Sequence, residues 1–217
     1  MTLGAGYLTA RRRIVEAGFG DDITWAEGLA KVRPDADYVL REAAWVIVNS
    51  GFRFQVARRL WPGLEQAFRG FKVPAVNETC APAALAVLNH PGKIGAIIRF
   101  AEVLHREGSE AIVALSQHPP DLVCLPWIGK ITCWHLAKVL GADVVKPDVH
   151  LQRAAQAAKT SSPLALCEAI RAELGDRLTV IDSVLWRYGE QQRARGWPGW
   201  AELWANVNRS AGVCPGR

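Results

Sequence analysis

The chain has 217 residues, half of them hydrophobic, and a formal net charge of +5. This length and composition suit one sizeable domain or two lobes, and they exclude wholesale disorder. The positive charge favours an anionic partner, of which a nucleic-acid backbone is the commonest. The five cysteines form no CxxC pair, which argues against structural disulfides and a four-cysteine metal site and fits a reducing cytoplasm.

Apolar residues recur with a helical period along most of the chain. A nearly all-apolar stretch at 39–48 predicts a central buried helix, and it is too short to cross a bilayer. The spacing i, i+3, i+4, i+7 recurs at 64–71, 94–101, 133–140 and 200–207. The period-two alternation typical of half-buried strands is missing. We therefore expect an all-α fold of about nine or ten helices.

Capping residues predict where several of these helices begin and end. Thr24 and Glu27 have the spacing of a capping box, and Ser162 and Asp176 suit the start of a helix. The glycines expected at helix ends are Gly51, Gly108, Gly141 and Gly175.

A sharp turn is predicted in the stretch 125–132, Leu-Pro-Trp-Ile-Gly-Lys-Ile-Thr. Pro and Gly close one short helix there, and an amphipathic helix starts at Lys130. The unpaired amides of Gly129, Lys130 and Ile131 would then form an anion site at the positive end of a helix dipole. An ordinary turn between two helices has the same spacing and is more common.

Asp148 lies 17 residues after Ile131, directly after Pro147 and at the expected start of a helix. Taken alone, an aspartate in this place is a helix N-cap.

Together, Leu125–Gly129 and Asp148–Arg153 resemble the helix-hairpin-helix/Gly-Pro-Asp superfamily of DNA glycosylases. That family includes endonuclease III, the adenine and 8-oxoguanine glycosylases and the alkylbase glycosylases. It pairs Leu-Pro-Gly-Val/Ile-Gly with Pro/Val-Asp-x-His-Leu/Ile-x-Arg a little under twenty residues later. The first motif is matched here at four of five positions, and the resemblance covers roughly 35–153.

The resemblance implies two helical lobes with the active site in the cleft between them. One lobe would span 36–146, with the hairpin at 119–140, and the other would combine 1–35 with 147–217. Double-stranded DNA would present a flipped-out modified base. Asp148 would be the catalytic carboxylate, assisting the attack of water on the N-glycosidic bond.

The resemblance also assigns the hairpin to the DNA backbone. The residues expected to bind phosphate are Trp127, Gly129, Lys130, Ile131 and Thr132. A structural Na+ or K+ is expected at the main-chain carbonyls of Val123, Leu125 and Ile128. No other cofactor is required, and no iron–sulfur cluster is expected because the four-cysteine motif of some relatives is absent.

Two departures from the family pattern carry information. Ile131 occupies the position of the nucleophilic lysine of bifunctional members, so we expect a monofunctional enzyme that leaves the abasic site uncut. The alternative is a lyase that uses Lys130, although one step along a helix turns a side chain by ~100°. Trp127 replaces the first hairpin glycine. Either the turn does not require a positive φ there, or it tolerates the strain.

Residues of the base pocket or of a DNA-inserting wedge are less sharply defined. The candidates are Asn49, Phe52, Arg53, Phe54, Glu42 and Trp186. Asn49 could read a base edge and a nearby phenylalanine could stack or intercalate, but a helix end with aromatics turned into the core fits equally. Glu42 could instead pair with an arginine, and Trp186 could be core. His150 is expected to support the Asp148 helix, and Arg153 to brace the lobes.

The expected protein is a monomer that works on DNA in a bacterial or archaeal cytoplasm, associated with the nucleoid and not with a membrane. The excised base stays open among alkylated purines, deaminated or mismatched pyrimidines and oxidised guanine. A first alternative is a prokaryotic antiphage glycosylase that removes hypermodified phage bases. The others are a non-catalytic hairpin protein that only binds DNA and a helical adaptor with no nucleic-acid role.

Overall fold

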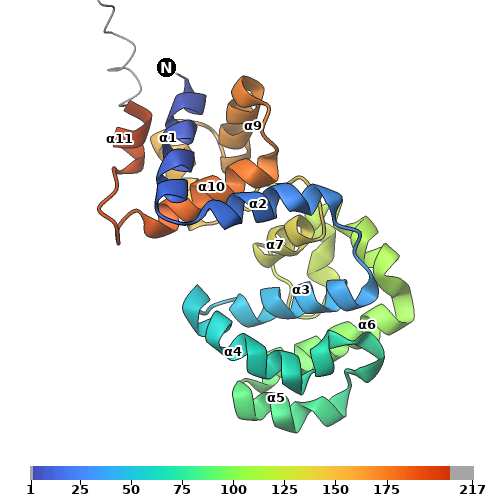
Figure 1. The fold of residues 1–217 in the computed structure, drawn as a ribbon. Helices are drawn as coiled ribbons and strands as arrows, with labels where there is room; N and C mark the ends of the chain where they lie inside the picture. Colours follow the sequence, from blue (N-terminus) through green and yellow to red (C-terminus); the bar gives the residue numbers. More distant parts are fainter. Residues whose placement is uncertain (1, 206–217) are drawn as a thin grey trace, which may run out of the picture. The chain divides into compact units, whose positions relative to one another are not determined.

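The computed structural model describes residues 2–205, which contain helices and no strand (Figure 1). This confirms the expected all-α fold. The α-helices are α1 (Leu3–Glu16), α2 (Gly20–Gly28), α3 (Ala36–Asn49), α4 (Phe54–Ala67), α5 (Ala81–Val87), α6 (Pro91–Leu115), α7 (Thr132–Val139), α8 (Val149–Ala157), α9 (Pro163–Leu174), α10 (Leu178–Gln191) and α11 (Trp200–Ala205). Short 3-10 helices are η1 (Leu29–Lys31), η2 (Arg69–Phe71), η3 (Val73–Ala75), η4 (Glu78–Cys80) and η5 (Pro119–Cys124). No described helix is both long and apolar enough to span a lipid bilayer.

The chain forms two compact units, one of 31–142 and the other combining the segments before 31 and after 142. The division falls after Ala30 and Ala142, rather than after 35 and 146. Hydrogen bonds explain the second boundary, because the backbone of Thr179 donates to Asp143 and that of Lys146 donates to Asp182. These contacts tie 143–146 to α10.

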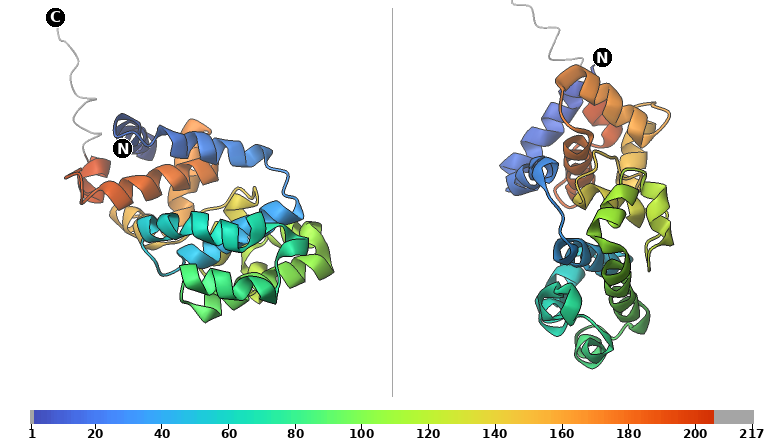
Figure 2. Two further views of the ribbon diagram at one scale, coloured as in Figure 1. Left: turned by 60° about the horizontal axis from the view of Figure 1, so that its bottom comes forward. Right: turned by 90° about the vertical axis from the view of Figure 1, so that its right-hand side faces the viewer.

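The 31–142 unit is built around α3, as its apolar sequence predicts. Asp35 caps this helix, with its carboxylate accepting the amide of Tyr38 at 2.8 Å. The side of α3 that faces the core packs on α6 and α7, and α6 runs alongside it (Figure 2). The buried residues of α3 are Val39, Leu40, Ala43, Ala44, Val46, Ile47 and Val48.

The other unit is centred on α10, which packs against α1, α2, α8 and α9. Aromatic rings fill its C-terminal part: Trp200 stacks on Trp204 with centroids 5.9 Å apart, and Tyr188 lies 5.1 Å from both Trp197 and Trp200. Several of the nine tryptophans are therefore core residues.

Several helices begin or end where the sequence predicts, at residues that cap the helix through short-range contacts. Ser162 caps α9 by accepting the amide of Ala165, and Gly175 ends that helix with a φ of +78°. Gly51 and Gly141, with φ of +77° and +99°, directly follow the ends of α3 and α7. Gly108 also has a positive φ, but it interrupts α6 rather than ending it.

Two expected helix starts are wrong. Thr24 lies inside α2, where its hydroxyl reaches back to the carbonyl of Gly20, so it caps nothing. Asp176 is not the N-cap of α10, a position held by Arg177. Its carboxylate instead accepts hydrogen bonds from Tyr7 and Arg11. Asp176 thus binds Tyr7 and Arg11 of α1 instead of capping α10.

A close approach at Gly189 gives a first prediction. A Cβ atom there would lie 2.9 Å from the Trp200 ring and 3.0 Å from His150 Nδ1. Gly189→Ala should therefore lower the free energy of unfolding by about 1–3 kcal/mol through overpacking, as measured by urea denaturation. The matched control is Gly28→Ala, where nothing lies within 4 Å. Equal stability of the two variants would contradict the close packing of α8 on α10.

Candidate functional site

The turn after η5 is pinned to the core by apolar side chains. Leu122, Leu125 and Ile128 are each at most 6% exposed, and the Ile128 amide donates to the Leu125 carbonyl at 3.2 Å. The side chains between and after these anchors point outward. Val123, Trp127 and Ile131 are 47%, 43% and 41% exposed. The turn thus presents apolar side chains to solvent from a rigid base.

The amides at this turn are partly used within the protein. The Gly129 amide donates to the Thr132 hydroxyl at 2.7 Å, so the expectation that it is unpaired is wrong. The hydroxyl of a residue at the start of a helix competes for the same donor. Within the described residues, the amides of Lys130 and Ile131 have no hydrogen-bond partner. Two donors of the expected three remain available to an anion.

Trp127 adopts a left-handed conformation, with φ at +65°. The first explanation for its place in the turn, that no positive φ is needed, is therefore wrong. Strain of about 1–2 kcal/mol is offset by contacts of the ring, whose Nε1 donates to Ser50 Oγ at 3.2 Å. The ring of His90 approaches edge-on at 5.5 Å. Gly92 leaves the necessary space, since a Cβ there would lie 2.8 Å from the indole.

Lys93 joins this turn to the end of α3. Its side chain lies on the apolar side of α6, and the residue is 3% exposed. The ammonium donates to the backbone carbonyls of Ile47, Val48 and Ser50 and to the Ser50 hydroxyl. Burial lowers the pKa of Lys93 to about 8. Sequence reasoning missed this residue, although a lysine directly before the apolar series 94–101 was a visible signal.

The pocket and wedge candidates at 49–54 extend from the end of α3 to the start of α4. The Oδ1 atom of Asn49 is buried and has no partner among the described residues. The ring of Phe52 lies 4.9 Å from the Lys93 ammonium, and Phe54 meets Trp45 edge-on at 5.8 Å. Arg53 is exposed directly before α4. The Arg53 guanidinium in this loop is therefore open to solvent, whereas Phe52 and Phe54 both contact residues of the 31–142 unit.

Glu42 and Trp186 lie in different units. Glu42 pairs with Arg41 at 3.2 Å, and burial raises the pKa of its carboxyl. Trp186 packs edge-on to His150 at 6.5 Å, and the guanidinium of Arg187 lies 4.8 Å from its ring. Each candidate thus has a partner within its own unit.

Asp148 is the N-cap of α8, as its local sequence predicts. Its Oδ1 accepts the amides of His150 at 2.9 Å and Leu151 at 3.3 Å. Its Oδ2 lies 3.2 Å from Nζ of Lys146, and the Asp148 side chain is 12% exposed. The carboxylate is thus anchored through both oxygens.

The backbone around Asp148 explains this geometry. The Asp148 amide donates to the Lys146 carbonyl at 2.8 Å, which closes a three-residue turn at Pro147. Proline restrains φ near the value that such a turn needs. Gln152 donates to the Pro147 carbonyl at 2.9 Å. The pairing of Lys146 with Asp148 is thus built into a rigid turn, and sequence reasoning missed the lysine.

Metal-binding groups are limited in the described chain. Residues 2–205 contain no cluster of three or more His, Cys, Asp or Glu side chains that could hold a metal. The carbonyl of Leu125 already accepts the Ile128 amide, which leaves one of its lone pairs for the monovalent cation expected there with Val123 and Ile128.

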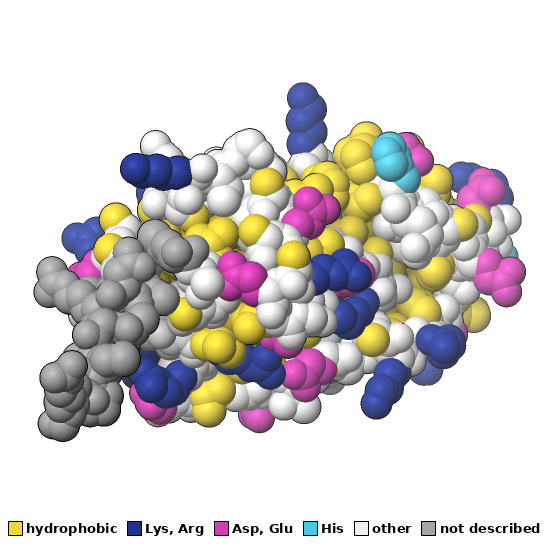
Figure 3. Space-filling model, turned by 90° about the horizontal axis from the view of Figure 1, so that it is seen from above, with side chains coloured by type: hydrophobic (Ala, Val, Ile, Leu, Met, Phe, Trp, Pro, Cys, Tyr) yellow, Lys and Arg dark blue, Asp and Glu magenta, His cyan; other side chains and the backbone are white. Residues whose placement is uncertain are grey.

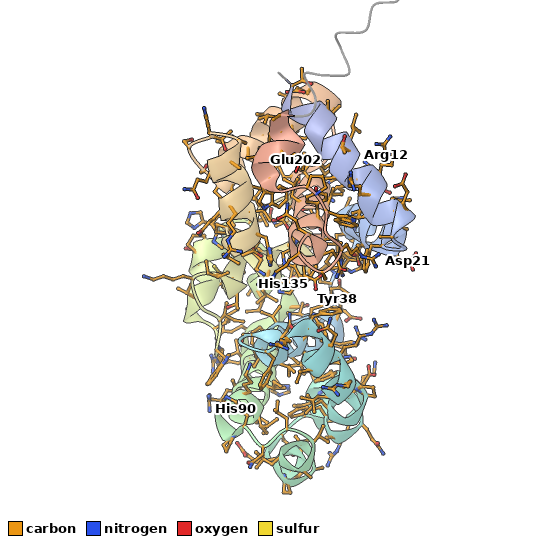
Figure 4. The ribbon with its side chains drawn as sticks, turned by 90° about the vertical axis from the view of Figure 1, so that its left-hand side faces the viewer. Arg12, Asp21, Tyr38, His90, His135 and Glu202 are labelled. Atoms are coloured by element: carbon orange, nitrogen blue, oxygen red, sulfur yellow. The ribbon has the colours of Figure 1, made fainter. Side chains whose placement is uncertain are left out.

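The basic residues do not gather into one patch on the face seen in Figure 3, where lysine and arginine side chains alternate with acidic ones. The consecutive arginines Arg11, Arg12 and Arg13 show why. Arg11 is paired with Glu27 and Asp176. Arg12, which projects outward from α1 with 71% of its side chain exposed, lies 3.8 Å from Glu16 (Figure 4). Internal ion pairs use part of the positive charge.

Comparison of the chain with protein-family models, curated proteins and solved structures found no match.

The buried ammonium of Lys93 predicts a pH-dependent stability. Its pKa of about 8 in the folded protein lies below the ordinary lysine value of 10.5, so the unfolded chain binds more protons between these values. The free energy of unfolding of the wild type, minus that of Lys93→Met, should therefore rise by about 1–3 kcal/mol from about pH 7 to about pH 10.5. Urea denaturation at both ends of this range measures it.

The control is Lys93→Arg, whose guanidinium stays charged throughout this pH range. Its free energy of unfolding, minus that of Lys93→Met, should not change between the two pH values. A flat difference for the wild type would show that its ammonium is not buried as described.

Proposed function

We propose that this chain is a DNA glycosylase, which hydrolyses the N-glycosidic bond of a modified base flipped out of double-stranded DNA. The observation that supports the proposal is the anchored carboxylate of Asp148. One oxygen accepts two amides of α8 and the other lies beside an ammonium. A carboxylate held in one orientation suits electrostatic stabilisation of a cationic transition state, because it needs no reorganisation during the reaction.

The turn after η5 would act as the phosphate-binding hairpin. Support comes from the amides of Lys130 and Ile131, which have no hydrogen-bond partner within residues 2–205 and lie at the N-terminus of α7. Backbone amides and a helix dipole favour a phosphate at such a place. Lys130 is exposed and adds a positive charge. The indole of Trp127 would contact the DNA surface beside this phosphate.

The proposed reaction divides the work between the flipped nucleotide, water and Asp148. As the bond from C1′ to the base lengthens, positive charge develops on the sugar, and the Asp148 carboxylate stabilises it. The same carboxylate orients or deprotonates the attacking water. Base release leaves an intact strand with an abasic site. The working unit is a monomer on duplex DNA.

Asp148→Asn tests the catalytic assignment on a panel of duplexes, each with one alkylated, deaminated, oxidised or hypermodified base. Abasic sites are detected as strand breaks after alkali treatment. On the duplex that the wild type cleaves, we expect the variant to lose at least about 100-fold in single-turnover rate while still binding DNA. The amide keeps the oxygen that caps α8 but loses the negative charge.

The matched control is Asp35→Asn, which alters an equivalent N-cap, that of α3, and should release the base at the wild-type rate. Base release by Asp148→Asn at the wild-type rate would disprove the catalytic role. DNA binding without release from any duplex would favour the non-catalytic hairpin protein. Affinity that does not weaken between about 50 and 200 mM salt would favour the helical adaptor.

The monofunctional character has its own test at Ile131, which is 41% exposed. Incubation of the wild type with abasic DNA and borohydride should give no covalent adduct, because no lysine occupies this position. Ile131→Lys should give a trapped adduct, since its amine can form an imine with the open-chain aldehyde of the abasic sugar. An adduct with the wild type that disappears in Lys130→Ala would instead establish Lys130 as a lyase nucleophile.

A further inference from the structure

The ion pair between Lys146 and Asp148 is not needed to cap α8. Oδ1 alone accepts the amides of His150 and Leu151, and the ammonium lies 3.2 Å from the other oxygen. Both side chains are largely withdrawn from solvent, with 23% of Lys146 and 12% of Asp148 exposed. Partly buried ion pairs contribute little net stability because desolvation offsets their attraction. Stability alone therefore does not account for the ion pair between Lys146 and Asp148.

Three hydrogen bonds hold the backbone of the pair in place. The Lys146 amide donates to Oδ1 of Asp182 at 2.9 Å, and Asp182 is 1% exposed on α10. The Lys146 carbonyl accepts the Asp148 amide, and the Pro147 carbonyl accepts Gln152. Neither backbone can drift away from the other. This backbone geometry keeps the Lys146 ammonium within reach of Oδ2, which lies 3.2 Å away.

We propose that Lys146 is the charge partner that allows the Asp148 carboxylate to approach DNA phosphates. The inference rests on the proposed function, because it concerns the carboxylate assigned to catalysis there. Duplex DNA carries one negative charge per ~1.7 Å of its axis, so an uncompensated carboxylate at its surface weakens binding. The ammonium cancels this charge, and it holds Oδ2 in one direction. Lys146 is thus a positioning residue, and Asp148 is the group that faces the sugar.

A double-mutant cycle measures this role without knowledge of the excised base. Wild type, Lys146→Met, Asp148→Asn and the double variant are titrated against a fluorescein-labelled duplex with one tetrahydrofuran abasic analogue, at about 100 mM salt. Fluorescence anisotropy gives the dissociation constants. We expect Lys146→Met to weaken binding about tenfold when Asp148 is present. In the Asp148→Asn background it should cost only about two- to threefold, the effect of one lost positive charge.

Two further variants separate charge pairing from structure. Lys146→Arg should bind DNA as the wild type does, because a guanidinium keeps the pair. Lys72→Met removes an ion pair with Asp37, which is 2.9 Å long in the other unit, and should show the same small loss with and without the Asp148→Asn change. Thermal unfolding of every variant controls for stability. Because a purely structural role of Lys146 would change stability alone, only charge pairing predicts the coupling in affinity.

The outcomes separate the inference from the function on which it rests. Equal losses from Lys146→Met in both backgrounds would overturn the charge-partner role and leave the glycosylase proposal standing. A wild type that does not bind the duplex would overturn both. A borohydride-trapped adduct with abasic DNA that Lys146→Arg abolishes would also overturn the inference, because Lys146 would then be a nucleophile. Strong coupling with rescue by arginine would establish it.

Discussion

The carboxylate of Asp182 is the constraint on which the candidate catalytic segment depends. It is buried on α10, and it accepts the amide of Lys146. The next two residues form a turn, and the turn ends at the N-cap of α8. One buried acceptor on a central helix thus determines where Asp148 lies relative to its own unit. Precise placement of a reacting group by secondary contacts is what a preorganised site requires.

The other unit uses a buried charge in a comparable way, with the signs reversed. The ammonium of Lys93 binds carbonyls at the C-terminal end of α3, where the helix dipole is negative. Ser50, which accepts from the same ammonium, also accepts from the strained Trp127. The turn that presents Trp127 and the loop after α3 therefore share one anchor. In both units a buried polar group orders a segment that carries exposed candidate residues.

Short-range patterns predicted much of this structure, and long-range polar partners account for what they missed. The apolar stretch 39–48, the Ser162 cap and the Asp148 cap depend on residues within one or two helical turns. Asp176 did not cap α10 because Tyr7 and Arg11 bind it from α1. Lys93 could not be assigned, because its acceptors lie more than forty residues away. Lys146 lies only two residues from its partner Asp148, but a turn has no repeating hydrophobic pattern, so no sign of this pairing was visible in the sequence.

The composite unit has a consequence for how the chain folds during synthesis. Residues 31–142 are continuous, so they can form their core as soon as they leave the ribosome. Helix α1 cannot, because it packs on α9 and α10, which are made after residue 162, and its Tyr7 and Ile14 are buried. This N-terminal helix must wait, with its apolar side uncovered, until more than a hundred further residues have been added. During synthesis the apolar side of α1 is therefore open to aggregation until α9 and α10 have been made.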